Sequence, residues 1–170
     1  MLNRSRLALV VVIASLALLA YVIFGASDED RILARLKELA SAVETKTDET
    51  NIVFRTARIN GVFKQGLEPT VTLSAPELQT QSGIRELATL AAQAPQVYGD
   101  LTLSIGATDI HVEGAVARAV SQVTLTGNRG GELRREERNV RFELHRAGGE
   151  WRVTAIHVAE RSEAQPEARP

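Results

Sequence analysis

The sequence predicts an α+β domain preceded by an N-terminal membrane-spanning helix. An unbroken apolar run covers residues 7–24, and apolar residues at helical spacing follow it as far as residue 91. From residue 100 onward the apolar period changes to two, with glycine-rich turns between the alternating segments. Because the helices come first and the strands follow in succession, we expect the strands to form an antiparallel sheet packed against the helices.

The composition excludes several classes of protein and partner. The chain has 170 residues and no cysteine, which excludes a disulfide framework, a thiolate nucleophile and a zinc site with cysteine ligands. Residues 1–27 contain two arginines and no acid, so the remainder has 18 basic against 21 acidic residues, a net charge of −3. That charge does not attract phosphates over a distance, and we expect no nucleic-acid partner.

The apolar run from Leu7 to Phe24 predicts a transmembrane helix. Its only clearly polar member is Ser15, and a helix of this length spans about 27 Å, close to the hydrocarbon thickness of a bilayer. The alternative is a cleaved signal peptide, whose apolar region is typically about 7 to 15 residues long. Cleavage after Ala26 would put the bulky Phe24 at the third position before the cut, whereas cleavage after Ser27 stays open as an alternative. We expect an uncleaved anchor.

The orientation of this anchor does not follow from charge alone, because Arg31, Arg35 and Lys37 on one side balance Arg4 and Arg6 on the other. Long domains translocate largely regardless of charge, and a short basic tail before an apolar run is typical of exported proteins. We therefore expect a single-pass protein of the cytoplasmic membrane with an extracytoplasmic, periplasmic domain.

Local signals place the elements of the domain. Ser27 and Asp30 have the spacing of a capping box, which predicts that a helix begins there. A second helix is expected over residues 51–63, a short strand over 70–74, and a third helix that begins near Ile84 and stops before Pro95. Strands are then expected over residues 101–105, 110–112, 115–126, 140–144 and 151–158, with hairpin turns at 128–131 and 147–150.

These elements divide the chain into three parts. Residues 1–27 are expected to form the cytoplasmic tail and anchor, residues 28–160 the folded domain, and residues 161–170 a disordered tail. The last of these segments has no apolar residue larger than alanine, so no burial offsets the entropy of ordering it.

The order of the elements resembles the NTF2-like (SnoaL-like) cone fold over residues 28–160. Two short motifs carry the resemblance further: Ser82-Gly-Ile-Arg-Glu86, which enters the third helix, and Gly149-Glu-Trp-Arg-Val153, in the last hairpin. The resemblance implies a strongly curved antiparallel sheet wrapped around about three helices, with a cone-shaped pocket between them, here in a membrane-tethered member. It does not imply one activity, because isomerases, dehydratases, transport factors and membrane-tethered assembly subunits share this fold.

The candidate pocket residues are aromatic residues and the small residues of one strand face: Phe54, Tyr98, Ala117, Ala119 and Trp151. An isomerase or dehydratase of this fold would need a phenolic donor, for which Tyr98 is the candidate, and an inward acid or imidazole. The candidates for that second role are Asp100, Asp109, His111 and His157. Alternation puts His111 and His145 on the outer face, and His157 points inward unless a bulge intervenes. No His spacing supports a metal site, and we expect no cofactor and no catalytic residue.

The highest density of charged residues lies between Arg129 and Arg152, where positively charged arginines and negatively charged glutamates are mixed. Opposite charges on neighbouring strands are ordinary surface patterning, but a partner that binds by charge would contact Arg134, Arg135, Arg138 and Arg141. We therefore expect a non-catalytic interaction or assembly module in the cell envelope, with an envelope protein or a second copy as its partner. The alternatives are a binder of a small apolar ligand or lipid in the cone, and an isomerase or dehydratase.

Overall fold

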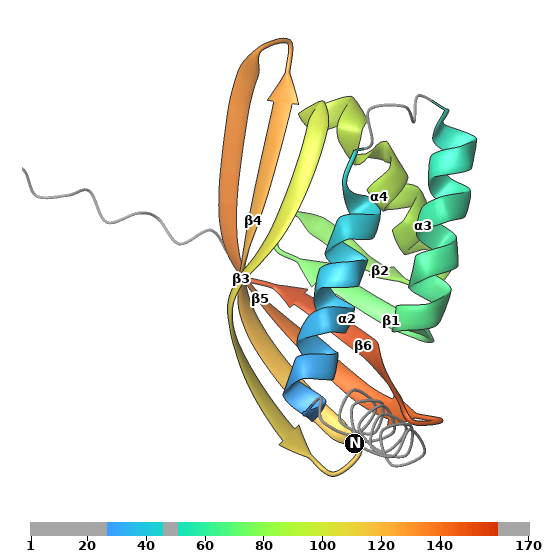
Figure 1. Cartoon of the computed structure of the whole chain (residues 1–170). Helices are drawn as coiled ribbons and strands as arrows, with labels where there is room; N and C mark the ends of the chain where they lie inside the picture. Colours follow the sequence, from blue (N-terminus) through green and yellow to red (C-terminus); the bar gives the residue numbers. More distant parts are fainter. Residues whose placement is uncertain (1–26, 46–50, 160–170) are drawn as a thin grey trace, which may run out of the picture.

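The structure, a computed structural model, describes residues 27–45 and 51–159. Three helices cover one side of a curved six-stranded sheet in this part of the chain (Figure 1). The helices are α2 (Asp28–Val43), α3 (Ile52–Gly66) and α4 (Ile84–Tyr98). The strands are β1 (Leu67–Ala75), β2 (Leu78–Ser82), β3 (Asp100–Glu113), β4 (Val116–Arg129), β5 (Glu132–Ala147) and β6 (Glu150–Val158). The predicted α+β class with about three helices is confirmed.

No described helix is long and apolar enough to cross a membrane. The predicted span, Leu7 to Phe24, and the predicted disordered tail, residues 161–170, both lie outside the described residues.

Helix α2 begins where the capping box predicted. The Ser27 hydroxyl accepts a hydrogen bond from the Asp30 backbone N–H at 3.2 Å, and the Ser27 N–H donates to the Asp30 carboxylate at 3.3 Å. The apolar stripe that faces the sheet includes Ile32, Leu36 and Leu39, all buried. Helix α2 could therefore be predicted from the sequence, because its capping box and the spacing of its apolar residues are both local signals.

Helix α4 runs one turn further than predicted, because Pro95 lies inside it rather than beyond its end. A proline in the last turn removes one backbone hydrogen bond, and the turn closes through the Gly99 N–H, which donates to the Pro95 carbonyl at 2.8 Å. Gly99 adopts φ +73° and ψ −136°, a backbone conformation that glycine adopts readily and residues with a Cβ do not.

The sheet is mixed, and the prediction of a purely antiparallel sheet was wrong. Strand order is β2-β1-β6-β5-β4-β3, with β1 parallel to β6 and the other pairs antiparallel. The first strand enters beside the last one, so the parallel pair joins segments far apart in the chain. The local period of apolar residues does not indicate that β1 pairs with β6. Strand β2 was missed because its sequence, LQTQS, is mostly exposed and has no alternation.

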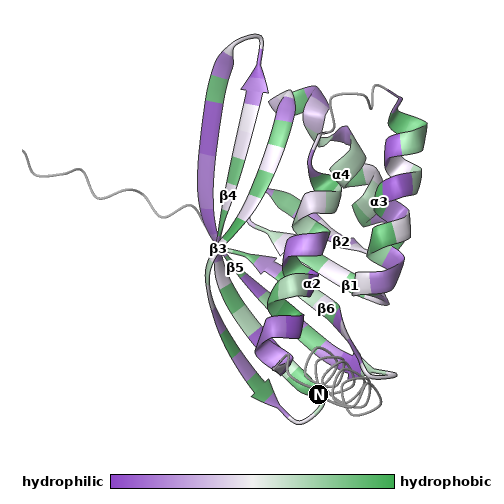
Figure 2. Cartoon of the chain, in the orientation of Figure 1, coloured by the Kyte–Doolittle hydropathy of each residue, from purple (hydrophilic) through white to green (hydrophobic). Residues whose placement is uncertain are grey.

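One apolar core fills the space between the concave side of the sheet and the helices. Trp151, Val153 and Phe142 contribute from the sheet, and α2 and α4 supply the covering side chains. Figure 2 shows a contrast in hydropathy along the sheet: hydrophobic residues recur in the helices and strands, whereas the end of β5 nearest the β4–β5 turn is largely hydrophilic. Helix α3 packs mainly against α4 and α2, and its Ile59 and Phe63 belong to the same core.

The close approach of Gly99 to β4 yields a stability prediction. A Cβ built on Gly99 would lie 2.0 Å from the Asn128 carbonyl oxygen, a backbone atom that cannot move aside. We expect Gly99→Ala to lower the free energy of unfolding by at least about 3 kcal/mol. The control is Gly114→Ala, which has a similar φ of +61° but nothing within 4 Å, and should cost only about 1–2 kcal/mol.

Chemical denaturation followed by the fluorescence of Trp151, the single tryptophan, measures both variants. Equal losses in the two would show that the left-handed backbone, and not the contact with Asn128, accounts for the requirement.

Candidate functional site

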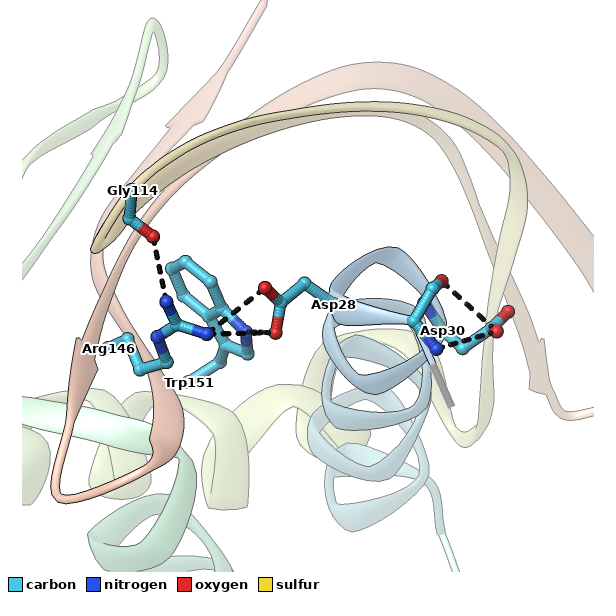
Figure 3. Close-up of polar contacts among 6 residues, drawn as sticks. Asp28, Asp30, Gly114, Arg146 and Trp151 are labelled. Atoms are coloured by element: carbon cyan, nitrogen blue, oxygen red, sulfur yellow. Dashed lines mark hydrogen bonds and ion pairs between the residues drawn. The ribbon is translucent and has the colours of Figure 1, made fainter. Parts of the chain in front are cut away.

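A polar cluster joins the first turn of α2 to the two hairpins beside it, and Figure 3 shows its geometry. The Asp28 carboxylate accepts hydrogen bonds from Arg146 Nη1 at 3.1 and 3.2 Å and from Trp151 Nε1 at 3.1 Å. Arg146 Nη2 donates to the Gly114 carbonyl at 3.1 Å in the β3–β4 turn. We call Asp28, Arg146, Trp151 and Gly114 the α2 clamp.

A buried hydrogen bond and a cation–π contact hold the clamp in addition to the ion pair. Trp151 is 2% exposed, so its indole N–H needs a hydrogen-bond acceptor inside the protein, and Asp28 provides it. The Arg146 guanidinium lies 5.2 Å from the centre of the Trp151 ring, a cation–π distance. These contacts fix the start of α2 to strands β5 and β6 and to the turn between β3 and β4.

The sequence did not predict this cluster. Neither Asp28 nor Arg146 was among the candidate site residues, and Trp151 was expected only as a pocket residue. Asp28 and Arg146 are 118 positions apart in the chain. The sequence around each residue indicates only a carboxylate in the first turn of a helix and an arginine beside a Gly-Gly turn, and not that the two are in contact.

The predicted pocket residues do not form one lining. Ala117 and Ala119 are buried on the concave side, in the same core as Phe142 and Leu144, their direct partners on β5. Trp151 is buried in that core and bound to Asp28. Phe54, by contrast, is 71% exposed on α3, and Tyr98 ends α4 with its backbone next to Gly127.

The candidate acids and bases lie largely outside the core. Asp100 and Asp109 are exposed on β3. The His111 side chain is 76% exposed and pairs with Glu113 at 3.0 Å, as the outward prediction required. Among the described residues no group of three or more His, Cys, Asp or Glu is arranged to hold a metal ion.

A bulge decides the direction of His157. Leu144 pairs with Val153 and Glu143 with Ala155, so Thr154 is an extra residue in β6 and the side-chain alternation reverses after it. His157 therefore lies on the convex side, where its Nδ1 is 2.8 Å from the Ser74 hydroxyl and its Nε2 is 3.9 Å from Glu143. The resulting row of Ser74, His157 and Glu143 crosses three strands on an open surface with the histidine 43% exposed.

The concave side also holds polar groups, of which Ser121 was not among the predicted site residues and Arg138 was predicted only as a contact for a partner. Ser121 is 1% exposed, and its hydroxyl is 2.9 Å from that of Thr108. Further along β5, Arg138 donates to Glu77 of the β1–β2 turn at 2.8 Å, with its side chain only 16% exposed. The alternation of apolar and polar residues does not reveal these groups, because each lies on the face that the pattern assigns to the core.

The four arginines predicted to bind a partner are divided between the two faces of β5. Arg135 and Arg141 alternate with Arg134 and Arg138, so adjacent members point to opposite sides. Arg135 pairs with Glu137 at 2.6 Å, and Arg134 lies 3.7 Å from Glu132. They form a mixed charged arm rather than one basic patch.

Two hollows in the described part of the chain lie on the helices. One, of about 410 Å³, is bounded by α3 and α4 and includes Ile52, Val53 and Arg85. The other, of about 300 Å³, lies along α4 beside Gln81. Neither includes a residue of strands β3 to β6.

No family model and no curated protein matches the chain. Several solved structures, by contrast, match it in fold. An NTF2-like protein with a cystatin-like fold from Novosphingobium aromaticivorans is 17% identical, with a TM-score of 0.63, over 99% of this chain and 96% of that one. A candidate dehydratase of the NTF2-like family from Streptomyces avermitilis is 13% identical, with a TM-score of 0.61, over 77% of this chain and 94% of that one.

The association domain of Caenorhabditis elegans CaMKII is 14% identical, with a TM-score of 0.58, over 77% of this chain and 94% of that one. At these identities the matches establish the fold alone, which is the NTF2-like, cystatin-like fold. The curved mixed sheet with three helices fits that cone.

The α2 clamp yields a second prediction. Asp28→Ala leaves the buried Trp151 N–H without an acceptor and Arg146 without its carboxylate. Because Asp28 and Arg146 are 29% and 36% exposed, water replaces part of the loss, and we expect destabilisation of about 1–2 kcal/mol.

The matched control is Glu29→Ala in the same turn, which is exposed and should change stability by less than about 0.5 kcal/mol. Denaturation monitored by Trp151 fluorescence compares the two variants. If Glu29→Ala costs as much as Asp28→Ala, then the effect comes from the helix dipole and not from the clamp.

Proposed function

We propose that this chain is a single-pass membrane protein of the cell envelope whose NTF2-like domain acts as a non-catalytic interaction or assembly module outside the cytoplasmic membrane. The α2 clamp is the observation that carries the proposal. Only Gly25 and Ala26 separate the apolar run from Ser27, the N-cap of α2. A helix clamped to two hairpins at its first residue would hold the domain close to the bilayer, with little freedom to turn.

The cap also favours an anchor over a cleaved signal peptide. Cleavage after Ser27 would remove the hydroxyl that accepts the Asp30 N–H, at a cost of about 0.5–2 kcal/mol. Cleavage after Ala26 would leave a charged amine at Ser27, at the positive end of the helix dipole, where a cation is unfavourable. An uncleaved chain keeps both the neutral backbone and the cap.

The absence of a catalytic role is supported by where the acids and bases lie. Chemistry of the isomerase or dehydratase type needs a donor and a base directed at one substrate. In the described part of the chain Tyr98 ends α4, Asp100, Asp109 and His111 are exposed, and His157 lies on the convex face. The alternative of an apolar ligand in the cone has less support, because Ala117 and Ala119 are packed within the core.

A role in association has a precedent in the fold, since one structural neighbour is the association domain of CaMKII. The charged arm formed by the ends of β4 and β5 is the surface of this chain that we propose for contact with an envelope protein or a second copy. It includes Leu133, which is 71% exposed between charged neighbours.

The anchor is tested by a charge in its centre. Leu16→Arg places a guanidinium at mid-bilayer, which disfavours insertion by about 2.5–3.5 kcal/mol, and we expect the chain to move from the membrane fraction to the soluble or aggregated fraction. Ser5→Arg adds the same charge outside the span and should leave the chain in the membrane. Intact mass of the membrane-bound protein should include residues 1–26; a mass that begins at Ser27 or Asp28 contradicts the anchor.

The partner surface is tested by photo-crosslinking in intact membranes. A photoreactive phenylalanine analogue at Leu133 should give a protein adduct, and the same analogue at Phe54, which is also 71% exposed, should give at least about five times less. Arg134→Glu together with Arg135→Glu should reduce the adduct at position 133. Equal labelling from both positions, or none from position 133, contradicts an interaction surface on this arm.

A further inference from the structure

The outer edge of β5 is only partly covered. Strand β6 pairs with β5 from Val140 to Ala147, whereas residues 132–139 pair with β4 on one side only, within the part of the chain that the structure describes. Unpaired backbone groups along such an edge accept another extended segment. The edge therefore has room for a strand in line with β6.

The ladder already continues one step beyond the end of β6. Val158 pairs with Val140, and the Ala159 N–H then donates to the Asn139 carbonyl at 2.9 Å. Antiparallel pairing fixes every later partner once one pair is known. In this register residue 160 lies opposite Arg138, residue 161 opposite Glu137, and residue 163 opposite Arg135.

The sequence beyond Ala159 matches this register in charge. Glu160 falls opposite Arg138, Arg161 opposite Glu137, and Glu163 opposite Arg135. Opposite charges on facing positions stabilise strand pairs, and like charges destabilise them. A shift by two residues, which keeps the same faces, would instead put Glu160 opposite Glu136 and Arg161 opposite Arg135. The continuation of β6 is the register that the charges favour.

Arg138 supplies an independent observation. Its Nη2 is bound by Glu77 at 2.8 Å, but its Nη1 is buried and has no hydrogen-bond partner among the described residues. A buried guanidinium N–H without an acceptor is unfavourable. Directly opposite residues of paired strands point to the same face, so Glu160 would place a carboxylate beside this group.

A second copy fits this edge less well. When an antiparallel edge pairs with itself about a two-fold axis, one residue always faces its own copy. Every residue from 134 to 138 is charged, so each central register brings two like charges together. The segment that follows Ala159 has no such conflict.

We propose that residues 160–164 extend β6 along the outer edge of β5, with Glu160 as a further ion-pair partner of Arg138 beside Glu77 and, at 3.9 Å, Glu136. The disorder expected from residue 161 onward would then begin only after residue 164. The extension covers the edge within the chain, so another strand reaches β5 only by displacing it. This inference is independent of the membrane anchor and of the proposed function.

The absence of cysteine from the chain makes disulfide trapping a clean test in the full-length protein. Residues 136 and 162 form a pair without mutual hydrogen bonds in the proposed register, and such pairs, with Cα atoms about 4.5 Å apart, suit a disulfide. We expect Glu136→Cys with Ser162→Cys to oxidise within the chain at least about ten times faster than the control, Glu136→Cys with Glu163→Cys. The control differs by one position, which turns the second thiol to the other face.

Intact mass and non-reducing digests identify the bond in membranes or nanodiscs. Equal rates for the two pairs, or no bond in either, overturn the proposal, and a bond between two chains assigns the edge to a second copy instead. With the 136/162 pair in place, Glu160→Arg should slow trapping at least about threefold, whereas Glu167→Arg should not change it. An unaffected rate in Glu160→Arg would overturn the role of the Arg138 ion pair.

Discussion

The burial of one face of a curved sheet is the constraint on which the rest of this structure depends. Strands β3 to β6 each present apolar side chains to the concave side, and this side would face water unless the helices covered it. Helices α2 and α4 do so with apolar stripes of their own, and α3 adds Ile59 and Phe63. The small side chains of Ala117 and Ala119 beside Phe142 are part of that packing.

The same packing explains the position of the α2 clamp. Trp151 is the largest fully buried side chain in the described part of the chain, and its indole N–H must be satisfied where the sheet and α2 meet. Asp28 meets this need at the first residue of α2, while Arg146 balances the charge and reaches the β3–β4 turn. One carboxylate therefore ties the first helix to both hairpins at that end of the sheet.

At the other end, the sheet extends beyond its apolar core. Here β5 has a charged sequence, ELRREERN, and the covering strand β6 has ended. Ion pairs such as Arg135–Glu137 and Arg138–Glu77 replace apolar contact as the source of local order. The molecule thus has one end fixed by burial, where the α2 clamp lies, and one charged end. Both the proposed partner surface and the proposed extension of β6 lie at the charged end.

Several elements could be predicted because their signals are local. The cap at Ser27, the stripe of Ile32, Leu36 and Leu39, and the Gly-Gly turns at 130–131 and 148–149 each lie within a few residues of what they specify. The outward direction of His111 also followed from alternation with Ile110 and Val112. The resemblance to the cone fold extended these local predictions to the arrangement of sheet and helices.

Other features depended on contacts between distant residues. The end of α4 beyond Pro95 depends on Gly99 fitting against Asn128, and the direction of His157 depends on an extra residue, Thr154, in β6. Neither the approach of Gly99 to Asn128 nor the extra residue in β6 can be predicted from a pattern of neighbouring residues. The candidate pocket residues failed to gather for the same reason, since Phe54 and Tyr98 were chosen by residue type and not by position.

The sequence by itself determined the class of each long element, the turns between the last three strands and the outward faces of β3 and β5, because caps, periods and glycines act over a few residues. The tertiary structure alone decided the parallel pairing of β1 with β6, the α2 clamp and the exposed edge of β5. Each of these joins residues more than 50 positions apart or depends on where a neighbouring strand ends. Such pairings are selected by the burial of a shared core, which no segment of the chain can form alone.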